Sequence, residues 1–380
     1  MIFLPDGVQD FLPDEYAIKH AVEEKIRKTF ISFGYKDIMP PTFEYSSNFS
    51  VLFDENNLYR FFDKKGNILA LRPDVTSQIG RIVSTKLKDK YPIKLCYVAN
   101  VFRYEDTQSG KMREFTQAGV ELIGLNQEES DAEVIALSIE ALRTLGLKDF
   151  KVEIGQAQIF NGIIENINLG KEETIQLREF LEQKNQSAIE TFIKEKKIKD
   201  DKARLLIELP LLFGDENIIL KVKKLYNIPK LNDSLDYLLK VYKILKDFGL
   251  SKYISFDLGM VQNLNYYTGI IFRCFIKGIG YAIYTGGRYD NLLSVYGKNI
   301  PATGFAISIE RVMLALKKQN IEILNKVPKV LIKYEEKARD NAYSKALDLR
   351  VHGKIVEIYS INRSFNIFED DFDEIIYLEE

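Results

Sequence analysis

Side chains that could hold a small polar ligand occur in the segment REFTQAGVELIG, residues 113–124. Successive side chains of a β-strand alternate between the two faces of a sheet, so Gln117 and Glu121 share a face with Gly119 between them. Because glycine has no side chain, its backbone can form the floor of a gap. An amide and a carboxylate on either side of such a gap could bind a small ligand that carries donor groups.

Polar groups recur at strand ends, or in strands otherwise fit for burial, in four further segments: LRPDVT, VFRYE, NLNYYTG and GGRYD. A polar face of a sheet commonly meets solvent, and this interpretation fits the hairpin taken alone. The recurrence favours a shared ligand site instead, because burying an unpaired polar group costs roughly 1–3 kcal/mol.

Residues typical of metal sites and nucleophilic catalysis are scarce. The chain has two histidines, His20 and His352, and neither has a cysteine or another histidine nearby in the sequence. A metal site needs clustered ligands, and a catalytic triad needs a histidine beside its nucleophile. We therefore expect no metal site, no catalytic triad and no cofactor. Cys96 and Cys274 lie in apolar runs, which predicts buried, reduced thiols.

The composition is that of a globular protein with two or three domains. The 380 residues are 46% hydrophobic and 28% charged, with a formal net charge of -2. This charge argues against a general attraction to nucleic acid or to an anionic membrane. No stretch approaches the roughly 18 apolar residues of a membrane span, and the first residues do not resemble a secretory signal. We expect a cytoplasmic protein.

Hydrophobic periodicity predicts the elements that position the polar residues. Apolar residues recur every four positions from Ile18 to Phe30, which predicts a helix that stops at Gly34. Two hairpins are expected, at 58–74 and 94–124, and Thr76 is expected to cap the helix between them. A further helix is predicted at 126–145.

The fold class predicted is α+β, an antiparallel sheet flanked by helices. A core domain spans 1–320, and a helical insertion interrupts it at about 161–250. A small C-terminal α/β domain follows at 325–380. Its last twelve residues hold seven carboxylates, and we interpret them as a short edge strand with an acidic rim.

In this order, the segments resemble the catalytic core of class II aminoacyl-tRNA synthetases, and specifically histidine–tRNA ligase. GVQDFLPDE is similar to the opening of that family, FRYE with REFTQ to its motif 2 hairpin, and GFAISIER to its motif 3. NLNYYTGIIF and GGRYD resemble the two histidine-recognition segments. The resemblance covers about residues 1–160 and 250–320, and it is specific because the motifs occur together.

The resemblance implies roles for individual residues in histidine binding. Asp74 and Thr76 would meet the α-amino group of histidine, and Gln117 would lie near its backbone groups. Glu121, Tyr267 and Tyr289 would contact the imidazole, and Tyr266 is a further residue expected to bind histidine.

Four arginines would lie on the phosphate side of such a site. Arg103 would touch the α-phosphate and the carboxylate, and Arg311 the terminal phosphate of a nucleotide. Arg113 and Arg288 are further possible phosphate-side residues. We favour a structural alternative for these arginines, with carboxylates such as Glu105 or Glu310 as partners, because buried arginines are normally ion-paired.

The sequence departs from the ligases at the recognition strand and at the C-terminus. Gln262 stands where the ligases carry an arginine, and the amides Asn263 and Asn265 follow it. An amide cannot supply the positive charge that the reaction needs, and such a loss typically costs on the order of 10²–10³ in rate. Asp74 stands where the ligases usually have glutamate. The C-terminal segment is shorter than an anticodon-binding domain, and its acidic tail would repel RNA.

Both departures resemble the regulatory subunits of ATP phosphoribosyltransferase, a family that has lost aminoacylation. This resemblance implies assembly with a short catalytic chain, feedback inhibition by histidine and a role in histidine biosynthesis. We also expect self-association as a dimer through Ile18 to Phe43, without nucleic-acid or membrane partners. The alternatives are a divergent histidine–tRNA ligase and a histidine-binding module without that partner.

Overall fold

The computed structural model describes residues 3–87, 90–104, 112–165, 167, 169–261, 267–324, 326–361 and 369–379. The chain divides into two compact units, Met1–Ile323 and Leu324–Glu380. Each unit has its own apolar core. All the residues predicted to contact a ligand belong to the larger unit.

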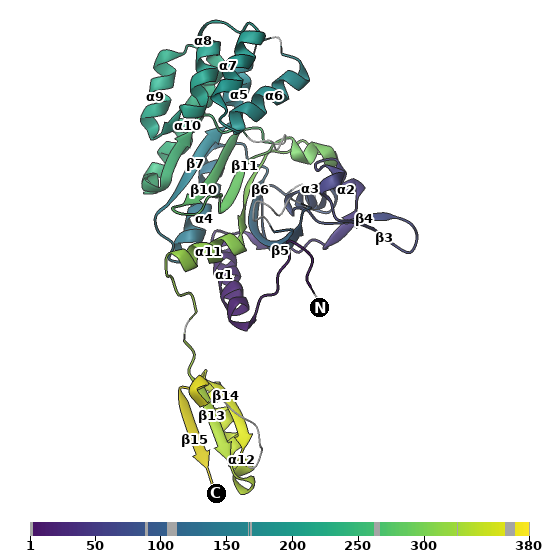
Figure 1. The fold of residues 1–380 in the computed structure, drawn as a ribbon, viewed down its shortest axis with the longest axis vertical. Helices are drawn as coiled ribbons and strands as arrows, with labels where there is room; N and C mark the ends of the chain where they lie inside the picture. Colours follow the sequence, from purple (N-terminus) through teal and green to yellow (C-terminus); the bar gives the residue numbers. More distant parts are fainter. Residues whose placement is uncertain are drawn as a thin grey trace. The chain divides into compact units, whose positions relative to one another are not determined.

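A nine-stranded sheet forms the centre of the larger unit (Figure 1). Its strands follow the spatial order β1 (Lys36–Asp37), β5 (Ile93–Phe102), β6 (Glu114–Ile123), β12 (Ala302–Ser308), β11 (Tyr284–Arg288), β10 (Ile270–Ile276), β7 (Phe150–Gln156), β9 (Ile254–Asp257) and β8 (Phe213–Gly214). Among these strands, β1–β5 and β7–β9 are parallel pairs and the other neighbours are antiparallel. The predicted antiparallel sheet flanked by helices is therefore confirmed apart from two pairings.

Three helices pack together against one face of this sheet, and they are α1 (Pro13–Ser32), α4 (Glu128–Arg143) and α11 (Ile309–Lys318). The first of them confirms the helix predicted from apolar periodicity. Proline at its first position suits helix entry because its φ is already fixed. Gly34 lies just past the end with a φ of +85°, a conformation that favours glycine.

The opposite face packs against α3 (Thr76–Thr85) and carries the predicted site. Val75, Ile79 and Val83 form one apolar cluster with Tyr97 and Tyr289. The elements before α3 are α2 (Ser47–Ser50) and a separate three-stranded sheet, β2 (Phe43–Tyr45), β4 (Ile68–Leu71) and β3 (Arg60–Phe62). Strands β3 and β4 confirm the first predicted hairpin, and β5 and β6 confirm the second.

A helical segment lies between β7 and β9, where the insertion was predicted. Its helices are α5 (Ala157–Ile164), α6 (Lys171–Glu182), α7 (Gln186–Glu195), α8 (Asp200–Glu208), α9 (Glu216–Leu225) and α10 (Pro229–Asp247). α10 packs against both α5 and α4. The long helix therefore joins the segment to a helix of the core (Figure 1).

The smaller unit is a three-stranded parallel sheet with one helix. Its elements are β13 (Lys329–Tyr334), α12 (Arg339–Val351), β14 (Ile355–Ser360) and β15 (Glu374–Leu378). β13 is the central strand, so β15 lies at an edge, as the acidic end of the sequence predicts. Within the described ranges, no helix combines the length and apolar character that crossing a membrane requires.

The space beside Gly119 corrects one prediction. Gln117 and Glu121 do share a face of β6, but Tyr97 of β5 lies directly opposite Gly119. A Cβ on Gly119 would lie 2.5 Å from the Tyr97 hydroxyl oxygen. The tyrosine ring therefore fills the gap that the sequence left open, because side chains from the partner strand occupy the same face.

Gly119→Ala should lower the free energy of unfolding by about 1–3 kcal/mol, because overpacking a buried site forces its neighbours to move. The added methyl group would overlap the Tyr97 ring and lie 2.7 Å from the carbonyl oxygen of Phe305. Urea denaturation would measure the loss. Gly280→Ala is a matched control because no atom lies within 4 Å of its Cβ position. Equal stabilities of the two variants would contradict the prediction.

Candidate functional site

A row of residues across three strands forms the floor of the site. Glu121 of β6 pairs with Gly304 of β12, and Gly304 pairs with Gly287 of β11. Directly paired residues of antiparallel strands project to the same face. A Cβ on Gly304 would collide with the Glu121 carboxyl group, and a Cβ on Gly287 would lie 2.7 Å from the ring of Tyr267. The two glycines make the room that Glu121 and Tyr267 occupy.

The carboxyl group of Glu121 is the centre of this row. The residue is 1% exposed. Its Oε1 accepts a hydrogen bond from the Thr76 hydroxyl at 2.6 Å, and its Oε2 accepts one from the Tyr289 hydroxyl. Burial raises the pKa of Glu121 to about 8, although these two donors act in the opposite direction. Near neutral pH the carboxyl group can therefore both donate and accept hydrogen bonds.

The start of α3 supplies two predicted residues, but one of them has another role. Thr76 was expected to cap the helix, and its hydroxyl binds Glu121 instead. Asp74, two residues before α3, bonds its first turn: its Oδ1 accepts hydrogen bonds from the Ser77 backbone N–H at 3.3 Å and from the Ser77 hydroxyl. Burial raises the pKa of Asp74, while Ser77 and the charge of Arg103 oppose this shift.

A cavity of about 500 Å³ brings together Arg103, Gln117 and Arg311. The Nε of Arg103 donates to the carbonyl oxygen of Pro73 at 2.7 Å. The guanidinium of Arg311 lies 4.7 Å from the centre of the Tyr281 ring. Two guanidinium groups in one hollow suit an anionic group, and the aromatic ring suits a flat one. The cavity therefore contains Arg103 and Arg311, the two arginines for which the resemblance implied phosphate contacts.

Tyr267 lines a separate cavity of about 200 Å³, together with Gln158, Asn161 and Asn291. This cavity lies where the beginning of the helical segment meets the turn before β10. Tyr266 and the amides Gln262, Asn263 and Asn265 lie outside the described residues.

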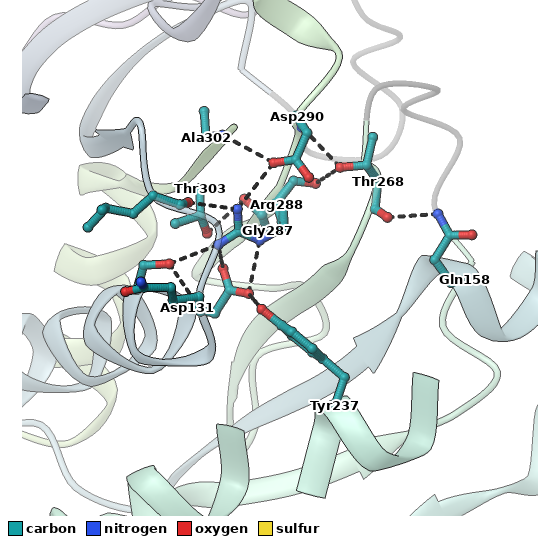
Figure 2. Close-up of polar contacts among 12 residues, drawn as sticks. Asp131, Gln158, Tyr237, Thr268, Gly287, Arg288, Asp290, Ala302 and Thr303 are labelled. Carbon is teal, nitrogen blue, oxygen red and sulfur yellow. Dashed lines mark hydrogen bonds and ion pairs between the residues drawn. The ribbon is translucent and has the colours of Figure 1, made fainter. Parts of the chain in front are cut away.

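Arg288 is held inside the protein by an ion pair (Figure 2). Its guanidinium donates twice to Asp131, at 2.9 and 3.0 Å, and once each to Ser130, Asp290 and the carbonyl oxygen of Leu125. These acceptors occupy all five N–H donors of the group, so none remains for a phosphate. Arg288 does not fit the phosphate-side prediction, and the structural alternative describes it.

Of the two carboxylates suggested as partners of the arginines, the structure describes one. Glu105 lies outside the described residues. Glu310 lines the larger cavity and accepts a hydrogen bond from the Thr116 backbone N–H at 2.9 Å. Arg113 packs 4.5 Å from the centre of the Tyr104 ring and is not among the described residues that line this cavity. A phosphate contact by Arg113 stays a prediction.

Several residues of the site were not found from the sequence. Tyr97 lies in an apolar run, and Gly304 lies in a strand that reads as buried, so neither stands out by type. Ser77 does carry a signal, because a serine three residues after Asp74 is placed to bond its carboxylate. In the described ranges, no group of three or more His, Cys, Asp and Glu side chains is placed to hold a metal ion.

Glu121→Gln should change how stability depends on pH. The pKa of Glu121 rises from 4.5 to about 8 on folding, so the folded chain holds this proton more tightly than the unfolded chain. The contribution of Glu121 to the free energy of unfolding is therefore greatest below pH 4.5, its unfolded pKa. It falls as the pH rises from 4.5 toward the folded pKa of about 8. As the pH rises from about 5.5 to 7.5, the free energy of unfolding of the wild-type chain should fall by on the order of 1–3 kcal/mol relative to that of the variant. Urea denaturation at each pH would measure this difference.

The exposed Glu172 provides the control for this experiment. Glu172→Gln should follow the wild-type dependence on pH. If Glu121→Gln follows it too, the raised pKa is contradicted.

Known proteins resemble this chain over its whole length. The family described as Histidyl-tRNA synthetase matches residues 7–312. A protein of Thermoanaerobacter pseudethanolicus named ATP phosphoribosyltransferase regulatory subunit is 68% identical over 380 residues, 100% of both chains. One of the same name from Caldanaerobacter subterraneus subsp. tengcongensis is 68% identical over 376 residues, 99% of each.

A solved structure from Bacillus halodurans agrees with these similarities. It is described as an ATP phosphoribosyltransferase regulatory subunit/histidyl-tRNA synthetase and has a TM-score of 0.90 at 32% identity. The match covers 100% of this chain and 99% of that one. The chain therefore belongs to the histidyl-tRNA synthetase-like family and, within it, to the ATP phosphoribosyltransferase regulatory subunits.

Proposed function

We propose that the chain has no reaction of its own and binds free histidine in order to regulate a partner. The partner is the short catalytic chain of ATP phosphoribosyltransferase, at the first step of histidine biosynthesis. Full-length similarity to proteins named as regulatory subunits supports the partnership. The ligand part of the proposal rests on the buried Glu121 carboxyl group between the Thr76 and Tyr289 hydroxyls.

The chemistry of histidine fits the groups around Glu121. Imidazole has one N–H donor and one acceptor nitrogen near neutral pH, and a carboxyl group that can be protonated complements either. Oxygen atoms of Asp74 and Thr76, which also bind Ser77 and Glu121, would accept hydrogen bonds from the ligand's ammonium group. Gln117 projects from the same face of β6 and could bind the ligand's carboxylate.

The absence of aminoacylation is supported by the sequence of the recognition strand. Gln262 supplies an amide where the resemblance places an arginine. A neutral amide cannot offset the negative charge that develops when a carboxylate attacks a phosphate. The proposal also includes self-association through Ile18 to Phe43, where Met39 is 91% exposed and Phe43 is 51% exposed.

A divergent histidine–tRNA ligase is the second candidate. One observation favours it: Arg103 and Arg311 line a single cavity of about 500 Å³, where two guanidinium groups could bind a nucleotide's phosphates.

Glu121→Gln should weaken histidine binding by about 10- to 100-fold, because a buried ligand group left without its hydrogen-bond partner costs about 1–3 kcal/mol. Titration calorimetry on the purified chain would measure the affinity. In the assembled complex, the variant should still activate the catalytic chain but require correspondingly more histidine for inhibition. Glu172→Gln is the control because Glu172 is exposed.

Two results would contradict this proposal. Unchanged affinity in Glu121→Gln would place the histidine site elsewhere. A catalytic chain whose activity and histidine sensitivity do not respond to the wild-type chain would exclude the regulatory role.

The purified chain should show no histidine-dependent exchange of pyrophosphate into ATP above background, because Gln262 lacks the required charge. Exchange at an ordinary enzymatic rate would establish the ligase instead. Gln262→Arg tests whether the scaffold is otherwise competent. A rise of about 10²–10³ over the residual rate would show that this one charge is the missing part.

A further inference from the structure

Two hydrogen bonds of the helical segment end on core residues that lie next to β10 and β11 (Figure 2). The hydroxyl of Tyr237, on α10, donates to Oδ2 of Asp131 at 2.6 Å. The Nε2 of Gln158, on α5, donates to the carbonyl oxygen of Thr268 at 2.8 Å. Asp131 belongs to α4, and Thr268 lies two residues before β10. Both bonds therefore end close to the residues proposed to bind histidine around Glu121, a group that we call the pocket.

The first of these bonds leads to Tyr289 through a buried ion pair. Oδ2 of Asp131 accepts from Tyr237 and also from Nε of Arg288 at 3.0 Å. Asp131 is 0% exposed and Arg288 is 3% exposed, so water cannot readily replace either partner. Arg288 is followed by Tyr289, whose hydroxyl donates to Glu121. A shift of Tyr237 would therefore act through Asp131 on Arg288, the residue next to Tyr289.

Further hydrogen bonds join three neighbouring strand ends into one unit: the residues before β10, the end of β11 and the start of β12. The backbone N–H of Thr268 donates to the carbonyl oxygen of Arg288 at 2.8 Å, and the Thr268 hydroxyl accepts from the backbone N–H of Asp290 at 2.9 Å. The Asp290 carboxylate accepts from Arg288 at 3.1 Å and from the backbone N–H of Ala302 at 3.2 Å. We name Thr268, Arg288, Tyr289, Asp290 and Ala302 the strand-end unit.

We infer that Tyr237 is a positioning residue, which fixes Tyr289 against Glu121 through Asp131 and Arg288 and so couples the place of α10 to the ligand affinity of the pocket. The inference relies on the proposed function only for the identity of the ligand. A purely local role for Tyr237 would stabilise α10 on α4 without changing the strand-end unit or the pocket.

The test compares two tyrosines of the same helix. Tyr237→Phe removes the bond to Asp131 and keeps the ring. Tyr242→Phe is the matched control, because the Tyr242 hydroxyl donates at 2.9 Å to Glu216, a residue of α9 within the helical segment. Each variant loses one bond from a tyrosine to a carboxylate, so a general weakening of α10 would affect both alike.

Two measurements on the full chain separate the possibilities. Amide hydrogen exchange in the free chain reports on Thr268, Tyr289, Asp290 and Ala302, whose backbone N–H groups are all hydrogen-bonded. We expect roughly tenfold faster exchange at these amides in Tyr237→Phe, because an opening of the unit becomes easier. Histidine affinity by calorimetry should fall about fivefold, the lower end of typical coupling between sites. Tyr242→Phe should change neither quantity.

Each other result has a definite meaning. Unchanged exchange in Tyr237→Phe, or equal changes in the two variants, would overturn the inference. Faster exchange with unchanged affinity would also overturn it, because the unit would then not control the pocket. If the wild-type chain binds no histidine, the proposed function fails, and the exchange measurement alone decides whether Tyr237 holds the strand-end unit.

Discussion

A buried carboxyl group needs hydrogen-bond donors, and Glu121 obtains them from two elements that are distant in the sequence. Thr76 comes from the start of α3 and Tyr289 from the residue after β11. Both must reach β6 at the same point. The glycine at 304 is then required because any side chain there would collide with Glu121. The positions of α3, β6 and the end of β11 relative to one another are therefore those that bring both donors to the Glu121 carboxyl group.

Two buried carboxyl groups of the core show two different solutions to the same problem. Asp131 meets the cation of Arg288, which donates to both of its oxygens, so the pair is internally satisfied. Among the residues that the structure describes, Glu121 receives hydrogen bonds from the neutral hydroxyls of Thr76 and Tyr289, and burial raises its pKa to about 8. A paired charge is suited to holding elements together. An unpaired carboxyl group with a shifted pKa is suited to meeting a ligand.

The partners of these two carboxyl groups are consecutive residues, because Arg288, which binds Asp131, precedes Tyr289, which binds Glu121. The ion pair connects α4 and α10 to the end of β11, and the hydroxyl of Tyr289 continues to Glu121. A regulatory chain needs such a connection between ligand and distant surface, whereas an enzyme needs charge at the reacting atoms. The proposed function and the inference about Tyr237 therefore depend on the same set of bonds.

The sequence alone determined the features that depend on neighbouring residues. Alternation along β6 placed Gln117 and Glu121 on one face, apolar periodicity gave α1, and the acidic end was correctly read as an edge strand. These predictions succeed because side-chain direction in a strand or helix follows from local backbone geometry.

Only the tertiary structure decided what occupies the space between elements. Tyr97 fills the gap at Gly119, and the hydroxyl of Thr76 donates to Glu121, although the sequence predicted that it would cap α3. Arg288 pairs with Asp131, 157 positions away, as well as with Asp290, which lies two positions away. Buried polar groups choose partners by distance in the folded chain, because a donor left unpaired away from water is costly. The number of residues between two positions in the sequence does not indicate how far apart they lie in the folded chain.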